Sequence, residues 1–189
     1  MFKLVRRGVL AGLALSILAP AGAQAAFCPA QPVAQRFLPW ADPSWYAELP
    51  GGGFEPSTPA WTLTGGAAAV EGNEPFYIGG AGDHRSLRLP PGATGTSPAI
   101  CLGADHPTLR LLVSNSGATL GSLTVSAVVR GRTLPIATLT AGDWAPTAPL
   151  PVALNVLALA SPQSVAFRFG AANGSWAIDD VYVDPYGKG

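Results

Sequence analysis

The sequence predicts an all-β protein built as a sandwich or barrel, and three observations support this. Short apolar segments recur along the chain, punctuated by 23 glycines and 19 prolines. Several segments alternate apolar and polar residues, which is typical of strands with one buried face. No segment shows the sustained 3.6-residue periodicity of a helix. We expect about ten strands, at 60–63, 67–70, 86–89, 99–102, 108–114, 122–130, 133–139, 151–155, 164–169 and 176–183.

The clearest pair of strands is a hairpin over 122–139. Its two alternating runs are joined by Gly131-Arg132, and a two-residue connection favours a tight hairpin turn. Only 152–160 could form a helix instead, and the prolines on either side limit that helix to two turns.

Residues 1–25 have the pattern of a secretory signal peptide. Three basic residues precede an apolar run too short to span a bilayer comfortably, and small residues precede position 26. We therefore expect a secreted protein whose mature chain, 26–189, forms a single domain with a proline-rich N-terminal arm at 26–50. No later run approaches the roughly 20 apolar residues of a membrane helix, so we expect no membrane-embedded segment.

The charge of the mature chain argues against nucleic acid as a partner. Lys3, Arg6 and Arg7 leave with the signal peptide, and all 11 acidic residues stay. The mature chain then has 8 basic and 11 acidic residues, a net charge of −3. Nucleic-acid binding requires clustered lysines and arginines, and only one lysine remains.

Cys28 and Cys101 are the only cysteines, and both lie in the exported part. A single pair in an oxidising compartment predicts one disulfide, which would tie the arm to the end of a central strand. A redox or metal role would need closer partners, such as a CxxC motif or a nearby histidine.

Three arginines occupy the polar positions of alternating strands, at Arg88, Arg110 and Arg168. Each is flanked by apolar residues that should point inward, so the arginines should point outward. If their strands are neighbours, the three guanidinium groups line one surface and bind carboxylates or sugar hydroxyls. The alternative is a solvated sheet face with cross-strand ion pairs.

The run 176–185 near the C-terminus contains two adjacent acids, Asp179 and Asp180, within an otherwise apolar strand. An earlier segment supplies a third acid, Glu55, between Phe54 and another short strand. These two ends of the domain are expected to meet, with the acids around a hard cation.

An early Phe54-Glu55 and Trp61 are combined with a terminal strand that contains Ile178-Asp179-Asp180-Val181. This combination resembles the β-jelly-roll carbohydrate-binding modules and the wider galactose-binding-like superfamily, which implies a two-sheet β-sandwich of jelly-roll type. A longer series of short motifs follows in order along the chain: Cys28, Pro39-Trp40-Ala41-Asp42, Gly52-Gly53-Phe54-Glu55, Gly72-Asn73-Glu74-Pro75, Ser86-Leu87-Arg88-Leu89-Pro90, Ser97-Pro98 and 176–185. This order more closely resembles a secreted bacterial family of unassigned function, and the resemblance covers nearly the whole mature chain.

The resemblance also implies a structural calcium where the first and last strands meet. In jelly-roll modules a glutamate after a phenylalanine and an aspartate of the last strand commonly hold it, which nominates Glu55 and Asp179, with Asp180 as second choice. Calcium accepts six to eight oxygen ligands in irregular geometry, so two carboxylates with carbonyls and water suffice. The alternative is that Asp179 accepts backbone N–H groups without a metal.

Exposed aromatic residues are the candidates for saccharide contact, because a pyranose stacks its C–H face on such rings. Tyr77 and Trp144 lie in expected loops, whereas Trp61 and Trp176 lie in strands and should belong to the core. Tyr46, beside Trp45, is a further candidate. Stray loop aromatics are also common, so each candidate has a structural alternative.

The expected function is non-catalytic binding of a saccharide or another extracellular or cell-envelope ligand. The sequence has no GxSxG, HExxH or phosphate-loop motif, so an enzyme is not expected, although Glu48, Glu71 and Glu74 could pair as glycosidase acids. The alternative is a structural or interaction protein whose sandwich has no small-ligand site.

Overall fold

A computed structural model describes residues 28–56, 61–103, 108–116, 121–152 and 162–184. The predicted signal peptide, 1–25, and nearly all of the possible helix, 152–160, lie outside the described residues. In the described part of the chain, no helix is both long and apolar enough to cross a membrane.

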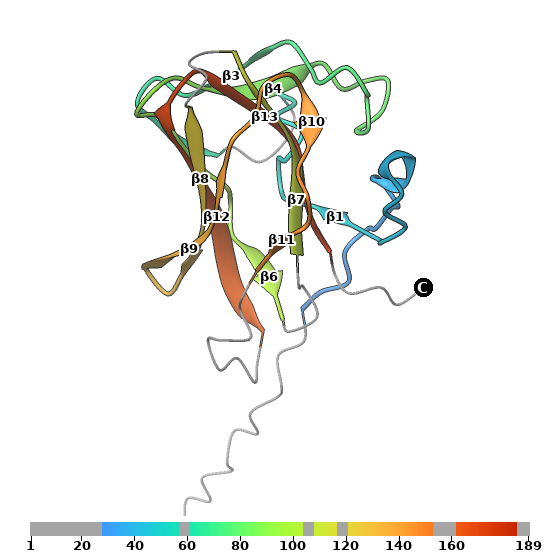
Figure 1. The fold of residues 1–189 in the computed structure, drawn as a ribbon. Coiled ribbons are helices and arrows are strands. Elements are labelled where there is room, and N and C mark those ends of the chain that lie inside the picture. The colour runs from blue at the N-terminus through green and yellow to red at the C-terminus, as the bar shows by residue number, and fades with distance from the viewer. Residues whose placement is uncertain (1–27, 57–60, 104–107, 117–120, 153–161, 185–189) are drawn as a thin grey trace, which may run out of the picture.

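Two antiparallel sheets face each other and form a sandwich (Figure 1). The first has seven strands in the order β10-β7-β13-β4-β3, with β1 paired to β13 and β11 to β7. Its bounds are β1 Ala47–Glu48, β3 Ala68–Glu71, β4 Arg85–Leu89, β7 Thr108–Asn115, β10 Ala145–Pro146, β11 Leu150–Pro151 and β13 Trp176–Asp184.

The second sheet has six strands in the order β2-β5-β12-β8-β9, with β6 paired to β12. Its bounds are β2 Thr62–Thr64, β5 Thr94–Thr96, β6 Ile100–Leu102, β8 Ser122–Val129, β9 Arg132–Leu139 and β12 Gln163–Asn173. The chain passes from one sheet to the other after β1, β2, β4, β6, β7, β9, β11 and β12, as in a jelly roll. The predicted fold class is therefore confirmed.

Nine of the ten predicted strands are present, whereas the predicted strand 151–155 shares only Pro151 with the short β11, and 153–155 lie outside the described residues. Three short strands, β1, β5 and β10, are additional. Each of the three has only two or three residues, too few to show alternation. Strand β5 passes close to the core: a Cβ on Gly95 would lie 2.7 Å from Cδ2 of Leu87. A side chain at position 95 would therefore displace the end of the buried Leu87 side chain of the opposite sheet.

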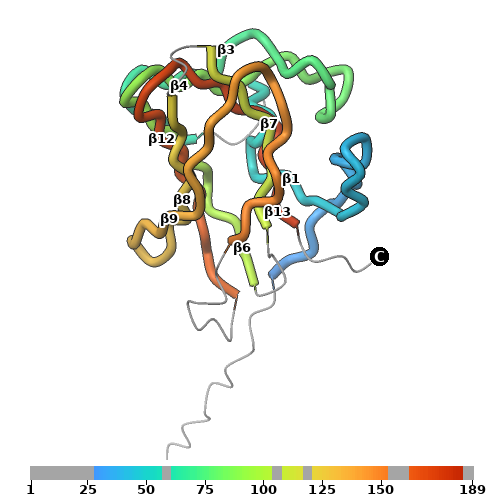
Figure 2. Tube along the Cα trace, in the orientation of Figure 1, coloured from blue at the N-terminus to red at the C-terminus, as the bar shows by residue number. Residues whose placement is uncertain are grey.

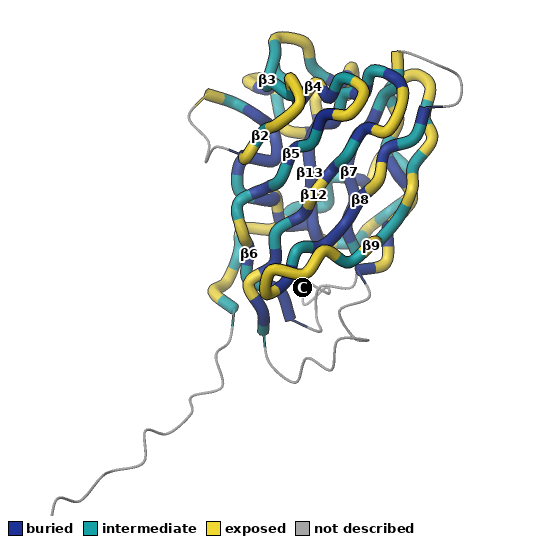
Figure 3. Tube along the Cα trace, turned by 90° about the vertical axis from the view of Figure 1, so that its left-hand side faces the viewer, coloured by how far each residue is buried: buried dark blue, intermediate teal, exposed yellow. Residues whose placement is uncertain are grey.

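The core between the sheets consists of the inward residues of both layers. Trp61 and Trp176 belong to it, as predicted, together with Phe167 and Phe169 of β12. Burial alternates along β12, which Figure 3 shows for the six-stranded sheet seen from outside. The period-two pattern of the sequence thus identified the buried face.

The hairpin of β8 and β9 forms as predicted, but its turn is one residue earlier. Val129 pairs with Arg132, so the two turn residues are Arg130 and Gly131. Both have positive φ, 49° and 75°, as a type I′ turn requires. The prediction of Gly131-Arg132 was wrong because Arg132 is needed in the ladder.

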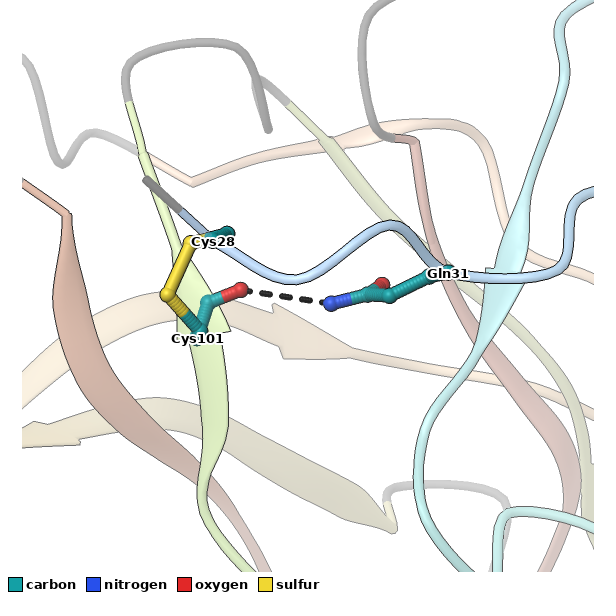
Figure 4. Close-up of a disulfide and its surroundings, with 3 residues drawn as sticks. All are labelled: Cys28, Gln31 and Cys101. Atoms are coloured by element: carbon teal, nitrogen blue, oxygen red, sulfur yellow. Dashed lines mark hydrogen bonds between the residues drawn. A yellow bond between two sulfur atoms is a disulfide. The ribbon is translucent and has the colours of Figure 1, made fainter. Parts of the chain in front are cut away.

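The predicted disulfide is present between Cys28 and Cys101, with Cα atoms 5.4 Å apart (Figure 4). Gln31 donates a hydrogen bond from Nε2 to the carbonyl oxygen of Cys101 at 3.4 Å. The disulfide ties the start of the arm to β6 across 73 positions of sequence. Closing a loop of this length should contribute about 4 kcal/mol in the chain-entropy model.

The arm lies against the outer face of the seven-stranded sheet (Figure 2). A second apolar cluster forms beneath it, made of Phe37, Tyr46, Ile78, Leu112 and Tyr182. This sheet is therefore covered on both faces. Its inner face packs on the sandwich core, and its outer face packs on the arm.

Candidate functional site

A β-bulge in β13 explains the two adjacent acids of the last strand. Asp179 pairs with Leu112 and Tyr182 with Arg110, so β13 has one residue more than β7 between these pairs. Ile178 and Val181, three positions apart, both pack into the sandwich core. The bulge therefore places Asp179 and Asp180 together outside the core, and Asp180 takes a positive φ of 50°.

Three carboxylates meet at this bulge. Glu74 and Asp83 come from the β3–β4 loop, residues 72–84, and Asp180 comes from β13. One oxygen of each lies within 4.8 Å of the others, and all three side chains are buried. We call Glu74, Asp83 and Asp180 the acidic group.

Three of the six carboxylate oxygens of the acidic group lack a hydrogen-bond donor among the described residues. Tyr182 donates its hydroxyl to Oδ1 of Asp180 at 3.0 Å, but no N–H or O–H donor of the described residues reaches Oδ2 of Asp180 or either oxygen of Asp83. Asp83 is only 5% exposed. Within the described ranges, no ion pair reaches Glu74, Asp83 or Asp180.

The pKa values reflect this uncompensated burial. Desolvation, and then the charge of Asp83, raises the pKa of Asp180 to about 8. Desolvation also raises the pKa of Asp83, with further contributions from the charges of Glu55, Glu74 and Glu48. Desolvation, followed by the charges of Asp180 and Asp83, raises the pKa of Asp179 to about 10.

A hollow of about 220 Å³ opens onto the acidic group. Its lining is Glu48, Gly53, Glu55, Gly79, Gly82, Asp83 and Asp180. A Cβ on Gly79 would lie 2.3 Å from Oδ2 of Asp83 and 3.0 Å from Oδ1 of Asp180, so a side chain at position 79 would occupy the space beside these oxygens. Oxygen donors without imidazole or thiolate are the set that hard cations prefer, and the acidic group could bind such a metal.

The predicted metal ligands are only partly brought together. Asp180 belongs to the acidic group, whereas Glu55 lines the same hollow and accepts the backbone N–H of His84 at 2.8 Å. Asp179 is fully buried and accepts the N–H of Asp180 at 2.9 Å. This last contact is the non-metal alternative considered for Asp179, while its role toward a metal stays a prediction.

Sequence reasoning missed Glu74 and Asp83 as members of the acidic group. Both lie in a loop with no strand periodicity, and their approach to β13 follows from the pairing of β4 with β13. The only available signal was the position of two acids near the ends of one loop.

A second concave surface lies on the outer side of the seven-stranded sheet. It is a groove of about 330 Å³ lined by Pro75, Ser114, Asn115, Ser116, Gly142, Asp143 and Trp144. The backbone N–H of Asn115 donates to the carbonyl oxygen of Gly142 at 2.8 Å, which joins two of its walls. Trp144 is half-buried and packs on the apolar cluster beneath the arm. We call this surface the Trp144 groove.

The second predicted aromatic, Tyr77, lies at the tip of the β3–β4 loop and is exposed, as is its neighbour Phe76. Phe76 packs edge-on against Trp40 of the arm, with ring centroids 5.0 Å apart. Figure 1 shows the loop, in green, and the arm, in blue, on the same side of the sandwich. Tyr46, which belongs to the arm, is buried between the arm and the sheet.

The three arginines do not share a surface. Arg88 is exposed on β4 of the seven-stranded sheet, and Arg168 is exposed on β12 of the other sheet, where Nε donates to Thr96 at 3.2 Å. Arg110 does point away from the sandwich core, but the arm buries it. The expectation of one common arginine face was therefore wrong, because β12 and β7 belong to opposite sheets.

Comparisons with known proteins give structural likenesses at low identity. No family model matches the chain, and a search of curated proteins finds no match. The CBM22-1 xylan-binding domain of Paenibacillus barcinonensis Xyn10C is 12% identical and aligns with a TM-score of 0.49 over 75% of this chain and 94% of that domain.

Two further solved structures align in the same way. The K1 cleaved adhesin domain of Lys-gingipain from Porphyromonas gingivalis is 19% identical, with a TM-score of 0.46 over 71% of this chain and 96% of that domain. A family 11 carbohydrate-binding module from Clostridium thermocellum is 8% identical, with a TM-score of 0.40 over 69% and 90%. At these identities and scores no function transfers, and the fold class follows from this chain's own strand order.

Proposed function

We propose that this protein is a non-catalytic binding module that holds a saccharide, or another ligand of the cell envelope, in the Trp144 groove. The observation that carries the proposal is a half-buried tryptophan in a groove that is also lined by the polar residues Ser114, Asn115, Ser116 and Asp143. Binding sites typically combine an apolar or aromatic surface with a few convergent polar groups, in volumes of roughly 300–1,000 Å³.

Each part of the groove has a role in this proposal. The indole of Trp144 offers a flat apolar face on which the C–H face of a pyranose stacks. The hydroxyls of Ser114 and Ser116 can donate or accept hydrogen bonds, and the exposed carboxylate of Asp143 accepts them from sugar hydroxyls. Pro75 closes the groove from the side of the β3–β4 loop.

Truncating the stacking platform should weaken saccharide binding. We expect the Trp144→Ala variant to lose about 2 kcal/mol of binding free energy, roughly a 30-fold weaker affinity. Isothermal titration with cellohexaose, xylohexaose and laminarihexaose measures this. Trp45→Ala is the matched control, because Trp45 is an exposed tryptophan of the arm outside the groove. Equal affinity of both variants would place the site elsewhere.

We also propose that the metal of the acidic group is calcium. Glu74, Asp83 and Asp180 would supply carboxylate oxygens, and Glu48 and Glu55 line the same hollow. Calcium suits a site with several anionic oxygens and irregular geometry, because it takes six to eight oxygen ligands. Full burial of Glu74 and Asp180 fits a held cation better than acid catalysis on a polysaccharide.

Export and a single mature domain, 26–189, complete the proposal. The Cys28–Cys101 disulfide supports export, because such bonds persist in oxidising compartments. One apolar core shared by both sheets supports a single domain.

A second candidate function is an interaction scaffold. Among the described residues, the exposed large apolar side chains all lie on the arm or the β3–β4 loop: Val33, Leu38, Trp45, Phe76 and Tyr77. Apolar side chains gathered on one side favour a protein partner. A scaffold of this kind would bind none of the three oligosaccharides.

A further inference from the structure

The β3–β4 loop connects the acidic group with the Trp144 groove. It begins and ends at the sheet edge, where the N–H of Gly72 donates to the carbonyl oxygen of His84 at 3.0 Å. Just inside this closure lie Glu74 and Asp83, two of the three acids. The residue after Glu74 is Pro75, which lines the groove. A carboxylate of the acidic group and a wall of the proposed binding site therefore belong to adjacent residues.

The tip of the loop is tied to the carboxylate of Glu74. Oε1 accepts the N–H of Ile78 at 2.7 Å, and Oε2 accepts the N–H of Phe76. Arg36 of the arm adds a hydrogen bond to the carbonyl oxygen of Ile78 at 2.7 Å. Hence the position of the Glu74 carboxylate decides where the backbone of 75–78 lies.

The third acid belongs to a different part of the fold. Asp180 is fixed by the ladder of β13 and by the hydroxyl of Tyr182. When Asp180 is ionised and no cation is bound, its charge repels Glu74 and Asp83 across less than 4.8 Å, which favours movement of the loop away from β13. A cation among the three oxygens turns this repulsion into attraction, because each carboxylate then faces a positive charge. The cation then also gives the buried, unpartnered carboxylate of Asp83 a partner.

We infer that a divalent cation held by Glu74, Asp83 and Asp180 positions the β3–β4 loop and thereby raises the affinity of the Trp144 groove for saccharide. This inference rests on the proposed function and adds regulation to the same site. The cation acts on the groove through Pro75 and the hydrogen-bonded tip. By linkage, saccharide must raise the affinity for the cation by the same factor.

The first test uses calcium alone and needs no saccharide. We expect calcium to slow hydrogen exchange of the Phe76 and Ile78 amides about ten-fold relative to chelated protein. The Asp83→Asn variant should lose this response, and Glu71→Gln should keep it. Glu71 is the matched control because it is an exposed acid at the end of β3 that pairs with Arg85. Unchanged exchange of both amides in the wild-type protein overturns the inference.

The second test measures the coupling itself. For whichever of cellohexaose, xylohexaose and laminarihexaose binds, chelation should weaken the affinity about ten-fold, within the 5–150-fold range typical of coupled sites. Saturation with that oligosaccharide should strengthen calcium binding by the same factor. Equal affinity in calcium and in chelator overturns the coupling while the proposed function stands. If no oligosaccharide binds, the proposed function fails, and the hydrogen-exchange result still decides whether the cation orders the loop.

Discussion

Metal-free protein should lose stability as the pH rises from about 4 to about 8, and calcium should remove this loss. The reason is the raised pKa of Asp180, to about 8, and of Asp179, to about 10, against an ordinary value of 3.8. Between these limits the folded state keeps protons that the unfolded state releases, so the free energy of unfolding falls with rising pH. Each retained proton lowers it by about 1.4 kcal/mol per pH unit.

The groups that face these two carboxyls determine the size of the effect. From the β3–β4 loop they are Glu74 and Asp83, and from β13 itself the hydroxyl of Tyr182. Within the described residues all of these are acids or neutral donors, so no protein cation replaces the proton. Calcium favours the ionised carboxylates and binds the folded state alone, which at 100 times its Kd adds about 2.7 kcal/mol.

Urea unfolding at pH 5 and pH 8, in chelator and in calcium, measures this prediction. The Asp180→Asn variant is a second test of this prediction. Its neutral amide should stabilise metal-free protein at pH 8 and abolish the response to calcium. Asparagine also tolerates the positive φ at this position. Stability that rises with pH in chelator, or a variant that still responds to calcium, would contradict the site.

Replacing Arg110 with methionine should cost about 3–5 kcal/mol of folding free energy, because it leaves a buried carboxylate without its partner. Arg110 pairs with Asp42 of the arm, and their side chains are only 7% and 14% exposed. Its Nε also donates to the carbonyl oxygen of Thr147 at 2.9 Å, and its guanidinium lies 4.3 Å from the centroid of the Phe37 ring.

Asp42 is held in its charged form by this arrangement. Burial by itself would raise its pKa, but hydrogen bonds from Tyr46 and Ser44, with the charge of Arg110, lower it overall. In the Arg110→Met variant the charge of Asp42 loses its counterion, so the arm should loosen from β7.

Urea unfolding compares Arg110→Met with Arg88→Met, an exposed arginine of the same sheet whose loss should cost about 0.5 kcal/mol or less. The double variant Asp42→Asn with Arg110→Met should recover part of the loss, because the unpaired charge is removed. Similar costs at positions 88 and 110 would mean that the pair does not hold the arm. The same contacts explain why Arg110 is a poor candidate for binding a ligand, since its guanidinium already contacts Asp42, Thr147 and Phe37.

Much of the fold could be predicted from the sequence because local chemistry controls it. Alternation in β12 identified a buried face, and the recurring turn residues identified nine of the ten predicted strands. The disulfide between Cys28 and Cys101 could be predicted because the sequence has no other cysteine. These features depend on neighbours in the chain or on elimination among few partners.

The candidate site depended on contacts that no local pattern contains. The sequence showed that Asp179 and Asp180 were anomalous in a strand, but only the bulge against β7 placed both outside the core. The partners of Asp180 arrive from the β3–β4 loop, about a hundred positions earlier in the chain, because β4 pairs with β13.

By itself the sequence determined a two-sheet sandwich, its core and its disulfide, since period-two burial and cysteine pairing are properties of short segments or single pairs. Only the tertiary structure decided that Arg110 is buried under the arm, that Arg168 faces away from Arg88, and that Glu74 and Asp83 join Asp180. The physical reason is that strand order and loop closure bring distant residues together, and alternation along a strand specifies a face without specifying what will cover it.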